Sequence, residues 1–176
     1  DEVASIDAQP GPAVVDPVLS VDRYPLPGAP MDIVAAGDRT GYVSLRRGGI
    51  LWFRVPESPG EPLETRRVVE DLEDARGLAI SDGVLYVVEL GTFPCPDDGL
   101  CEGPGMPDMS ASDGELTIIE TMRARVLAYD IQPDGGLANE RTVLSDLPVV
   151  DSLHAVNGME VGPDGRLYLS LGGVVR

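Results

Sequence analysis

The chain of 176 residues contains no lysine, and all 13 of its basic residues are arginine. Because 30 residues are acidic, the formal net charge is −17 at pH 7. Such a surface repels nucleic-acid phosphates and anionic lipid headgroups, which argues against both as partners. An acidic composition without lysine suits a high-salt habitat or a GC-rich genome, and the sequence leaves both open.

Long apolar runs are also missing. No run approaches the roughly 18 residues that a membrane-spanning helix needs, so we expect no membrane span. Hydrophobic residues make up 43% of the chain and the mean hydropathy is +0.01, values typical of a soluble globular protein. The length suffices for one domain with a substantial core.

Only two cysteines are present, and both lie in one Gly/Pro-rich segment, FPCPDDGLCEG. The spacing of Cys95 and Cys101 favours a local disulfide and therefore an oxidising compartment, so we expect a secreted protein, extracellular or periplasmic. Free thiols are the first alternative. A zinc site is the second, although this segment supplies two of the four N/S ligands that a structural zinc needs. The first residue is Asp1 rather than methionine, which suggests a processed or trimmed chain.

Short β-branched and aliphatic runs, bounded by Gly, Pro and Asp, dominate the chain and repeat along it. TRRVVEDL (65–72) matches ERTVLSDL (140–147), and the runs around Tyr86 and Tyr168 also match each other. A weaker third copy surrounds Tyr42, 44 residues before Tyr86, which is about the length of one four-stranded propeller blade. The repeat predicts an all-β fold, a β-propeller of four-stranded antiparallel blades. An ordinary β-sandwich is the alternative.

The predicted strands form two complete sets of four and the start of a third. The first set is 32–36, 41–45, 50–55 and 66–72, and the second is 77–80, 84–90, 125–131 and 141–147. The third begins with 158–161 and 167–171. A further outer strand is expected at 18–26, and residues 1–17 are predicted to form a flexible or surface-tracking arm.

The domain predicted for 18–176 therefore contains about two and a half blades. A closed ring needs at least four blades of about 40–45 residues each. We therefore expect the remaining part of the propeller as a partner, either in the same longer chain or as a second fragment.

Two enlarged connections indicate where a site would lie. They are the insertion 91–114 between two strands of the second blade, and the linker 148–157 before the third blade. In an up-and-down meander both leave from the same face, and long loops on a rigid scaffold commonly carry binding or catalysis.

The linker contains the only histidine, His154, a candidate general base because its pKa lies near neutrality. A histidine that simply bonds a loop carbonyl is the alternative. The insertion carries carboxylates that could bind Ca²⁺, above all Asp97, Asp98 and Asp113. Their spacing fits no EF-hand, and a solvated acidic loop is the alternative. Trp52 is expected to pack between blades.

The segments GYVSLRRGGILWFRV and HAVNGMEVGPDGRLYLSLGG resemble the glucose/sorbosone dehydrogenase family of secreted six-bladed propellers. The resemblance covers about residues 18–173, the front half of that fold. It implies a quinoprotein that oxidises a sugar hydroxyl with pyrroloquinoline quinone (PQQ) and Ca²⁺. Its most specific feature is His154, eight residues before the Gly-Pro-Asp turn. In the family this histidine takes the hydroxyl proton as hydride passes to the quinone.

The chain departs from the family pattern at two places. The family has an acid that supports the histidine where this chain has Gly173, and a glutamine where it has Ala75 and Arg76. Two other functions therefore stay open. One is a non-catalytic secreted propeller that binds a carbohydrate or a protein, and the other is a metal-dependent, lactonase-like hydrolase.

Overall fold

The computed structural model describes residues 23–46, 48–58, 60–91, 106–107, 118–119, 123–148 and 156–171. All elements within these ranges are β-strands, joined by turns and irregular segments. Among these residues there is no helix, and hence none long and apolar enough to cross a bilayer. The prediction of an all-β chain is confirmed for this part of the sequence.

The first sheet is an antiparallel meander with the strand order β1-β2-β3-β4. Its strands are β1 (Pro30–Gly37), β2 (Thr40–Leu45), β3 (Gly49–Arg54) and β4 (Glu64–Val69). The central strands carry β-branched and aromatic residues that fit a pleated, buried surface, and Tyr42 lies opposite Trp52 across the ladder.

The second sheet repeats this meander with the order β5-β6-β9-β10. Its strands are β5 (Asp74–Ser81), β6 (Val84–Gly91), β9 (Arg123–Ile131) and β10 (Leu137–Pro148). Residues 92–122 separate its second strand from its third and include the short pair β7 (Met106–Pro107) and β8 (Ile118–Ile119).

A third meander starts with β11 (Val156–Val161) and β12 (Leu167–Leu171), an antiparallel hairpin. The three repeats share one register. Tyr42 lies opposite Val34, Tyr86 opposite Ala79, and Tyr168 opposite Glu160. The repeat predicted from the tyrosine-centred runs is therefore a repeat of strand position as well as of sequence.

The first strand of each repeat is irregular at the same point. The register shifts between Pro30 and Asp32 in β1, between Ala75 and Leu78 in β5, and between Val156 and Gly158 in β11. A bulge bends a strand and increases its local twist. The equivalent shifts indicate that all three first strands are bent in the same way.

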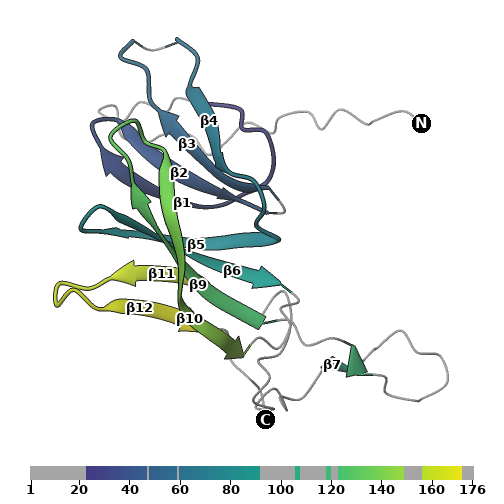
Figure 1. The fold of residues 1–176 in the computed structure, drawn as a ribbon. Helices are drawn as coiled ribbons and strands as arrows, with labels where there is room; N and C mark the ends of the chain where they lie inside the picture. The colour runs from purple at the N-terminus through teal and green to yellow at the C-terminus, as the bar shows by residue number, and fades with distance from the viewer. Residues whose placement is uncertain are drawn as a thin grey trace, which may run out of the picture.

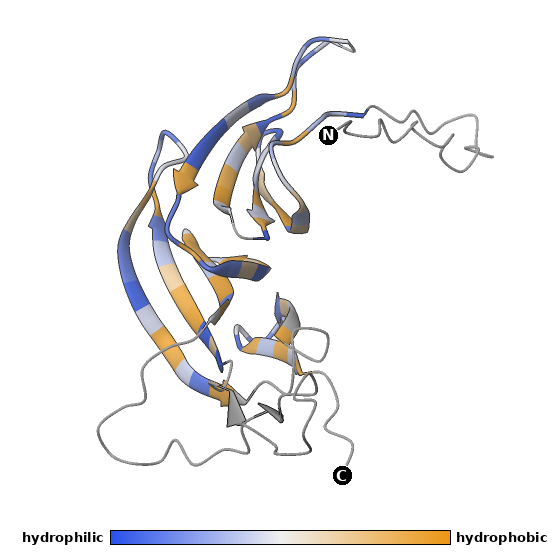
Figure 2. Ribbon diagram, turned by 90° about the vertical axis from the view of Figure 1, so that its right-hand side faces the viewer, coloured by the Kyte–Doolittle hydropathy of each residue, from blue (hydrophilic) through white to orange (hydrophobic). Residues whose placement is uncertain are grey.

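The repeats are stacked in sequence order, with the first strand of each beside the first strand of the next (Figure 1). One apolar cluster joins the first two sheets and includes Tyr42, Trp52, Leu78 and Leu127. A second joins the second sheet to the β11–β12 hairpin. Orange and blue bands alternate along the strands, as expected where successive side chains point to opposite faces (Figure 2).

The described part of the chain confirms the positions of the ten predicted strands to within a few residues. Two details differ. Residues 23–26, expected to end an outer strand, are not in a strand, because Pro25 lacks a backbone donor and Pro27 follows the segment directly. Ala75 and Arg76, expected in a linker, belong to β5, so the connection between the first two sheets lies at 70–73 instead of 73–76.

Candidate functional site

The two enlarged connections both leave the second sheet at the same end of its strands. Arg123, the first residue of β9, pairs with Gly91 of β6 on one side and with Pro148 of β10 on the other. Residues 92–122 and 149–155 therefore start from neighbouring strand ends, as predicted from the up-and-down order. We call this edge, formed by Asp74, Leu90, Arg123 and Pro148, the loop edge.

A buried carboxylate lies just inside the loop edge. Glu89 of β6 is 1% exposed and accepts a hydrogen bond from the Glu73 backbone N–H at 3.0 Å. Its other oxygen, Oε2, accepts from Arg125 Nε at 2.7 Å, and Arg125 Nη2 lies 2.7 Å from the same oxygen. A buried carboxylate is strongly destabilising unless it is paired and hydrogen-bonded, and Glu89 is both.

A second ion pair lies at the start of β5. Arg76 donates to Asp74 Oδ2 from Nε at 3.2 Å and from Nη2 at 2.8 Å, and both residues are nearly buried. The other Asp74 oxygen, Oδ1, is buried without a hydrogen-bond partner among the described residues. The Arg76 backbone carbonyl accepts from the Ser44 hydroxyl, which ties β5 to the first sheet. The loop edge thus contains a buried acceptor that no donor among the described residues satisfies.

A third ion pair joins β9 to β10 at the loop edge. Arg123 donates to Asp146 of β10 at 2.9 Å. Asp146 has φ 57°, a left-handed conformation that re-aims its carboxylate where the β9–β10 register shifts. Three arginines and three acids thus neutralise one another at this edge, within a chain that is strongly acidic overall.

A groove adjoins these pairs between β4 of the first sheet and β9–β10 of the second. Its volume is about 690 Å³, within the usual range of small-molecule sites. Arg125 and Tyr129 line it together with polar and acidic residues from both sides, namely Glu70, Asp71, Asn139 and Glu140. Tyr129 donates to Glu140 Oε2 at 2.8 Å. Burial, followed by this bond to a carboxylate, raises the pKa of the Tyr129 phenol far above its ordinary value, so the phenol stays protonated.

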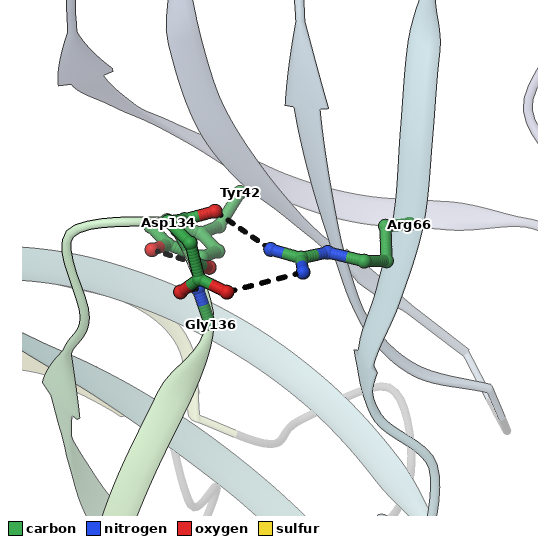
Figure 3. Close-up of polar contacts among 5 residues, drawn as sticks. Tyr42, Arg66, Asp134 and Gly136 are labelled. Carbon is green, nitrogen blue, oxygen red and sulfur yellow. Dashed lines mark hydrogen bonds and ion pairs between the residues drawn. The ribbon is translucent and has the colours of Figure 1, made fainter.

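The opposite edge of the second sheet is a docking contact (Figure 3). The β9–β10 turn lies against the first sheet, where Gly135 O accepts from the Tyr42 hydroxyl at 3.1 Å. Arg66 donates to Asp134 O at 2.7 Å and to Asp134 Oδ2 at 3.4 Å. The Asp134 carboxylate also accepts from Gly136 N–H at 2.9 Å, and these bonds lower the Asp134 pKa. This edge carries structural contacts, in contrast to the loop edge.

The predicted site residues are not placed. Cys95, Cys101, His154 and Gly173 lie outside the described residues, and so do the three metal candidates, Asp97, Asp98 and Asp113. The disulfide, the general base and the Ca²⁺ loop therefore remain predictions. Trp52, predicted to pack between repeats, belongs to the cluster between the first two sheets and is 5% exposed.

Sequence reasoning missed Glu89 and its partner. A signal was available, because the corresponding positions of the other repeats are Leu45 and Leu171, which occupy the same register opposite Pro30 and Val156. A carboxylate within the apolar run VLYVVEL therefore breaks the repeat at one position. Such a departure at a buried position is typical of structural ion pairs and of functional sites.

The described residues do not fit the cofactors that the resemblance implies. Within the described ranges no three His, Cys, Asp or Glu side chains converge as a metal site would require. The arginines of the loop edge already face carboxylates, so they are poorly suited to the carboxylates of PQQ. In comparisons with known proteins, no family model and no curated protein matches the chain.

Proposed function

We propose that the chain forms part of a secreted β-propeller that binds a sugar, or a similar polyhydroxy molecule, over the loop edge. The observation that carries this proposal is the convergence of two enlarged connections on Arg123. Stacked four-stranded meanders with first strands side by side are the arrangement expected of propeller blades. In such rings, ligands commonly bind where long loops rise from a rigid scaffold.

The chemistry of the edge supports a hydroxyl-rich ligand. Asp74 Oδ1 is a buried acceptor without a donor among the described residues, and a ligand hydroxyl that reached it would complete its hydrogen bonding. The neighbouring ion pairs keep the edge close to neutral, so an uncharged ligand meets no strong repulsion there. A sugar satisfies both conditions.

The enzymatic form of this proposal is the oxidation of a sugar hydroxyl, with PQQ and Ca²⁺ as the resemblance implies. His154 would accept the hydroxyl proton as general base, a role that is typically worth about 10²–10⁴-fold in rate. Since the described residues do not fit the metal or the quinone, those groups would need ligands from other residues.

The test combines binding and turnover. The protein is titrated with aldoses, and separately mixed with PQQ, Ca²⁺ and an aldose while reduction of an electron-accepting dye is followed. We expect saturable sugar binding that Asp74→Asn weakens at least several-fold. If dye is reduced, His154→Ala should lower the rate at least about 10²-fold, whereas Ser152→Ala in the same segment should not. Absence of aldose binding would refute the proposal, and an unchanged rate in His154→Ala would remove the general base.

A non-catalytic binding function is favoured by a different observation, the groove between β4 and β10. Its walls offer a guanidinium, an amide and carboxylates above apolar residues, a combination suited to carbohydrate hydroxyls. If the ligand occupies the groove, Asn139→Ala should weaken binding and Asp74→Asn should not. The two variants therefore distinguish the groove from the loop edge.

A further inference from the structure

The groove between β4 and β10 is built by two sheets that are neighbours in the fold. Its described lining residues are 68–72 on one side and 125, 129 and 137–140 on the other. The first wall is the end of β4 with the connection to β5, and the second wall is β9 with the start of β10. Apolar side chains from both walls contribute, among them Val68, Leu72 and Leu137. The described lining therefore comes from the first two sheets and the connection between them.

Three carboxylates line this groove without an arginine partner among the described residues. Glu70 and Asp71 belong to the first wall and Glu140 to the second. The guanidinium in the lining, Arg125, already faces the buried Glu89 carboxylate at 2.7 Å. With that pair counted as neutral, the described lining carries three unbalanced negative charges, contributed by both walls. The groove is therefore complementary in charge to a cationic ligand.

Glu140 is held in a defined orientation. Its Oε2 accepts a hydrogen bond from the Tyr129 phenol at 2.8 Å, and Tyr129 is 3% exposed within the cluster that joins the first two sheets. The other oxygen, Oε1, has no hydrogen-bond partner among the described residues. An acceptor that is oriented before binding loses less entropy when a ligand donates to it. Glu140 is thus the best-placed carboxylate of the groove for a ligand donor.

The spread of the carboxylates indicates the size of the ligand. Within the described residues, no three acidic, histidine or cysteine side chains lie close enough together to hold one metal ion. A single small cation would therefore leave part of the charge unmatched, whereas a molecule that extends along the groove can contact both walls. The groove volume of about 690 Å³ is typical of a small-molecule site.

We propose that the groove binds an amino sugar, a carbohydrate that carries a protonated amine. The inference rests on the carbohydrate-binding function proposed above for the groove and names the class of ligand. The ammonium group donates charge-assisted hydrogen bonds to Glu140, which are stronger than those between neutral groups. Asn139 and the carboxylates of the first wall bond the ring hydroxyls, while Val68 and Leu137 contact the apolar face of the ring.

The charge of the whole chain acts in the same direction. A net charge of −17 attracts cationic ligands and repels sugars that carry a carboxylate or a sulfate. Because the groove carboxylates are exposed, salt should screen their attraction for the ammonium group. The preference for the amine should therefore weaken as the salt concentration rises, and also as the pH is raised above the pKa of the ligand amine.

Calorimetric titration of the protein with glucosamine and with glucose tests the proposal, because the two sugars differ by an ammonium group in place of one hydroxyl. We expect glucosamine to bind at least about fivefold more tightly at low salt. Glu140→Gln keeps an acceptor for the Tyr129 phenol but removes the charge, so it should abolish most of this difference. Glu160→Gln removes an exposed carboxylate of β11, outside the groove lining, and should leave the difference unchanged.

The outcomes separate this inference from the function on which it rests. Equal affinities for the two sugars, or equal effects of Glu140→Gln and Glu160→Gln, would overturn the amino-sugar assignment and leave carbohydrate binding in place. Absence of binding by either sugar would refute both proposals. Putrescine, a diamine without hydroxyls, is the remaining probe. Putrescine binding as tight as that of glucosamine, and equally sensitive to Glu140→Gln, would overturn the assignment of a sugar.

Discussion

At the residue scale, Glu89 is a buried carboxylate, whose loss of hydration must be offset by hydrogen bonds and an opposite charge. Its carboxylate is held by a backbone N–H and by Arg125, and it stands where the other repeats have leucine. Arg125 also lines the groove, so the pair fixes one groove wall from inside the sheet. Removing one partner of such a buried pair destabilises the fold strongly, whereas replacing both partners by apolar residues destabilises it less.

Glu89→Leu should lower the free energy of unfolding by about 2–3 kcal/mol, because Arg125 loses its buried partner. Arg125 is 31% exposed and can turn toward water, so the loss should fall below the roughly 3–5 kcal/mol of fully buried pairs. Adding Arg125→Met should recover at least half of it. Urea denaturation of both variants measures this. Glu64→Gln, which breaks the exposed Arg54–Glu64 pair at 3.7 Å, is the control and should change little. A double variant less stable than Glu89→Leu would contradict the assignment.

The stability that the Asp134 carboxylate contributes to the fold should depend on pH. Its folded-state pKa is lowered by the Gly136 N–H and by Arg66, so the carboxylate stabilises the fold at every pH above the ordinary aspartate value of about 4. That contribution should be lost as the pH falls below about 4, through the ordinary pKa toward the lowered one. Thermal unfolding of the protein and of Asp134→Asn should therefore differ at pH 7 and converge toward pH 2. A difference that stays constant with pH would contradict this role.

At the scale of elements, two turns share a sequence pattern but differ in whether they pack against another sheet. Pro133-Asp134-Gly135 and Pro163-Asp164-Gly165 both place glycine at positive φ, at 80° and 74°, and both use the aspartate to accept from the N–H two residues on. Only the first turn is docked, since a side chain on Gly135 would overlap the Trp52 indole, whereas Gly165 has open space around it.

Gly135→Ala and Gly165→Ala form a matched pair. Both should carry the cost of a left-handed alanine, about 1 kcal/mol. Gly135→Ala should cost a further 1–3 kcal/mol or so, because it pushes the turn away from the first sheet. It should also shift the fluorescence of Trp52, the only tryptophan, while Gly165→Ala should not. Equal stabilities and spectra for the two variants would show that the β9–β10 turn is not docked on Trp52.

At the scale of the whole molecule, the fold followed from local patterns that each strand carries itself. The runs around Tyr42, Tyr86 and Tyr168 fixed strand positions, because apolar periodicity and turn residues act over a few neighbours. The order of the strands also predicted that the two enlarged connections share one edge. Both features depend on residues that are close in sequence, so they can be predicted without contacts between residues far apart in the chain.

The polar contacts could not be predicted in the same way. Glu89 meets Arg125, and Arg66 meets Asp134, across distances in sequence that no local pattern spans. The outer strand predicted for 18–26 is wrong at 23–26, because Pro25 has no backbone N–H to donate and Pro27 follows directly. His154 was singled out from the length of its linker, and its placement stays a prediction because it lies outside the described residues.

The most direct test of the proposed binding face is hydrogen exchange with and without a bound sugar. The loop edge and the β9–β10 turn lie at opposite strand ends of the second sheet, so each serves as the control for the other. Binding should slow exchange near Glu89–Gly91, Arg123–Arg125 and Asp146–Pro148, and leave the turns at 38–39, 82–83 and 132–136 unchanged. Slowed exchange at those turns, with none at the loop edge, would contradict the assignment of this edge as the ligand-binding face.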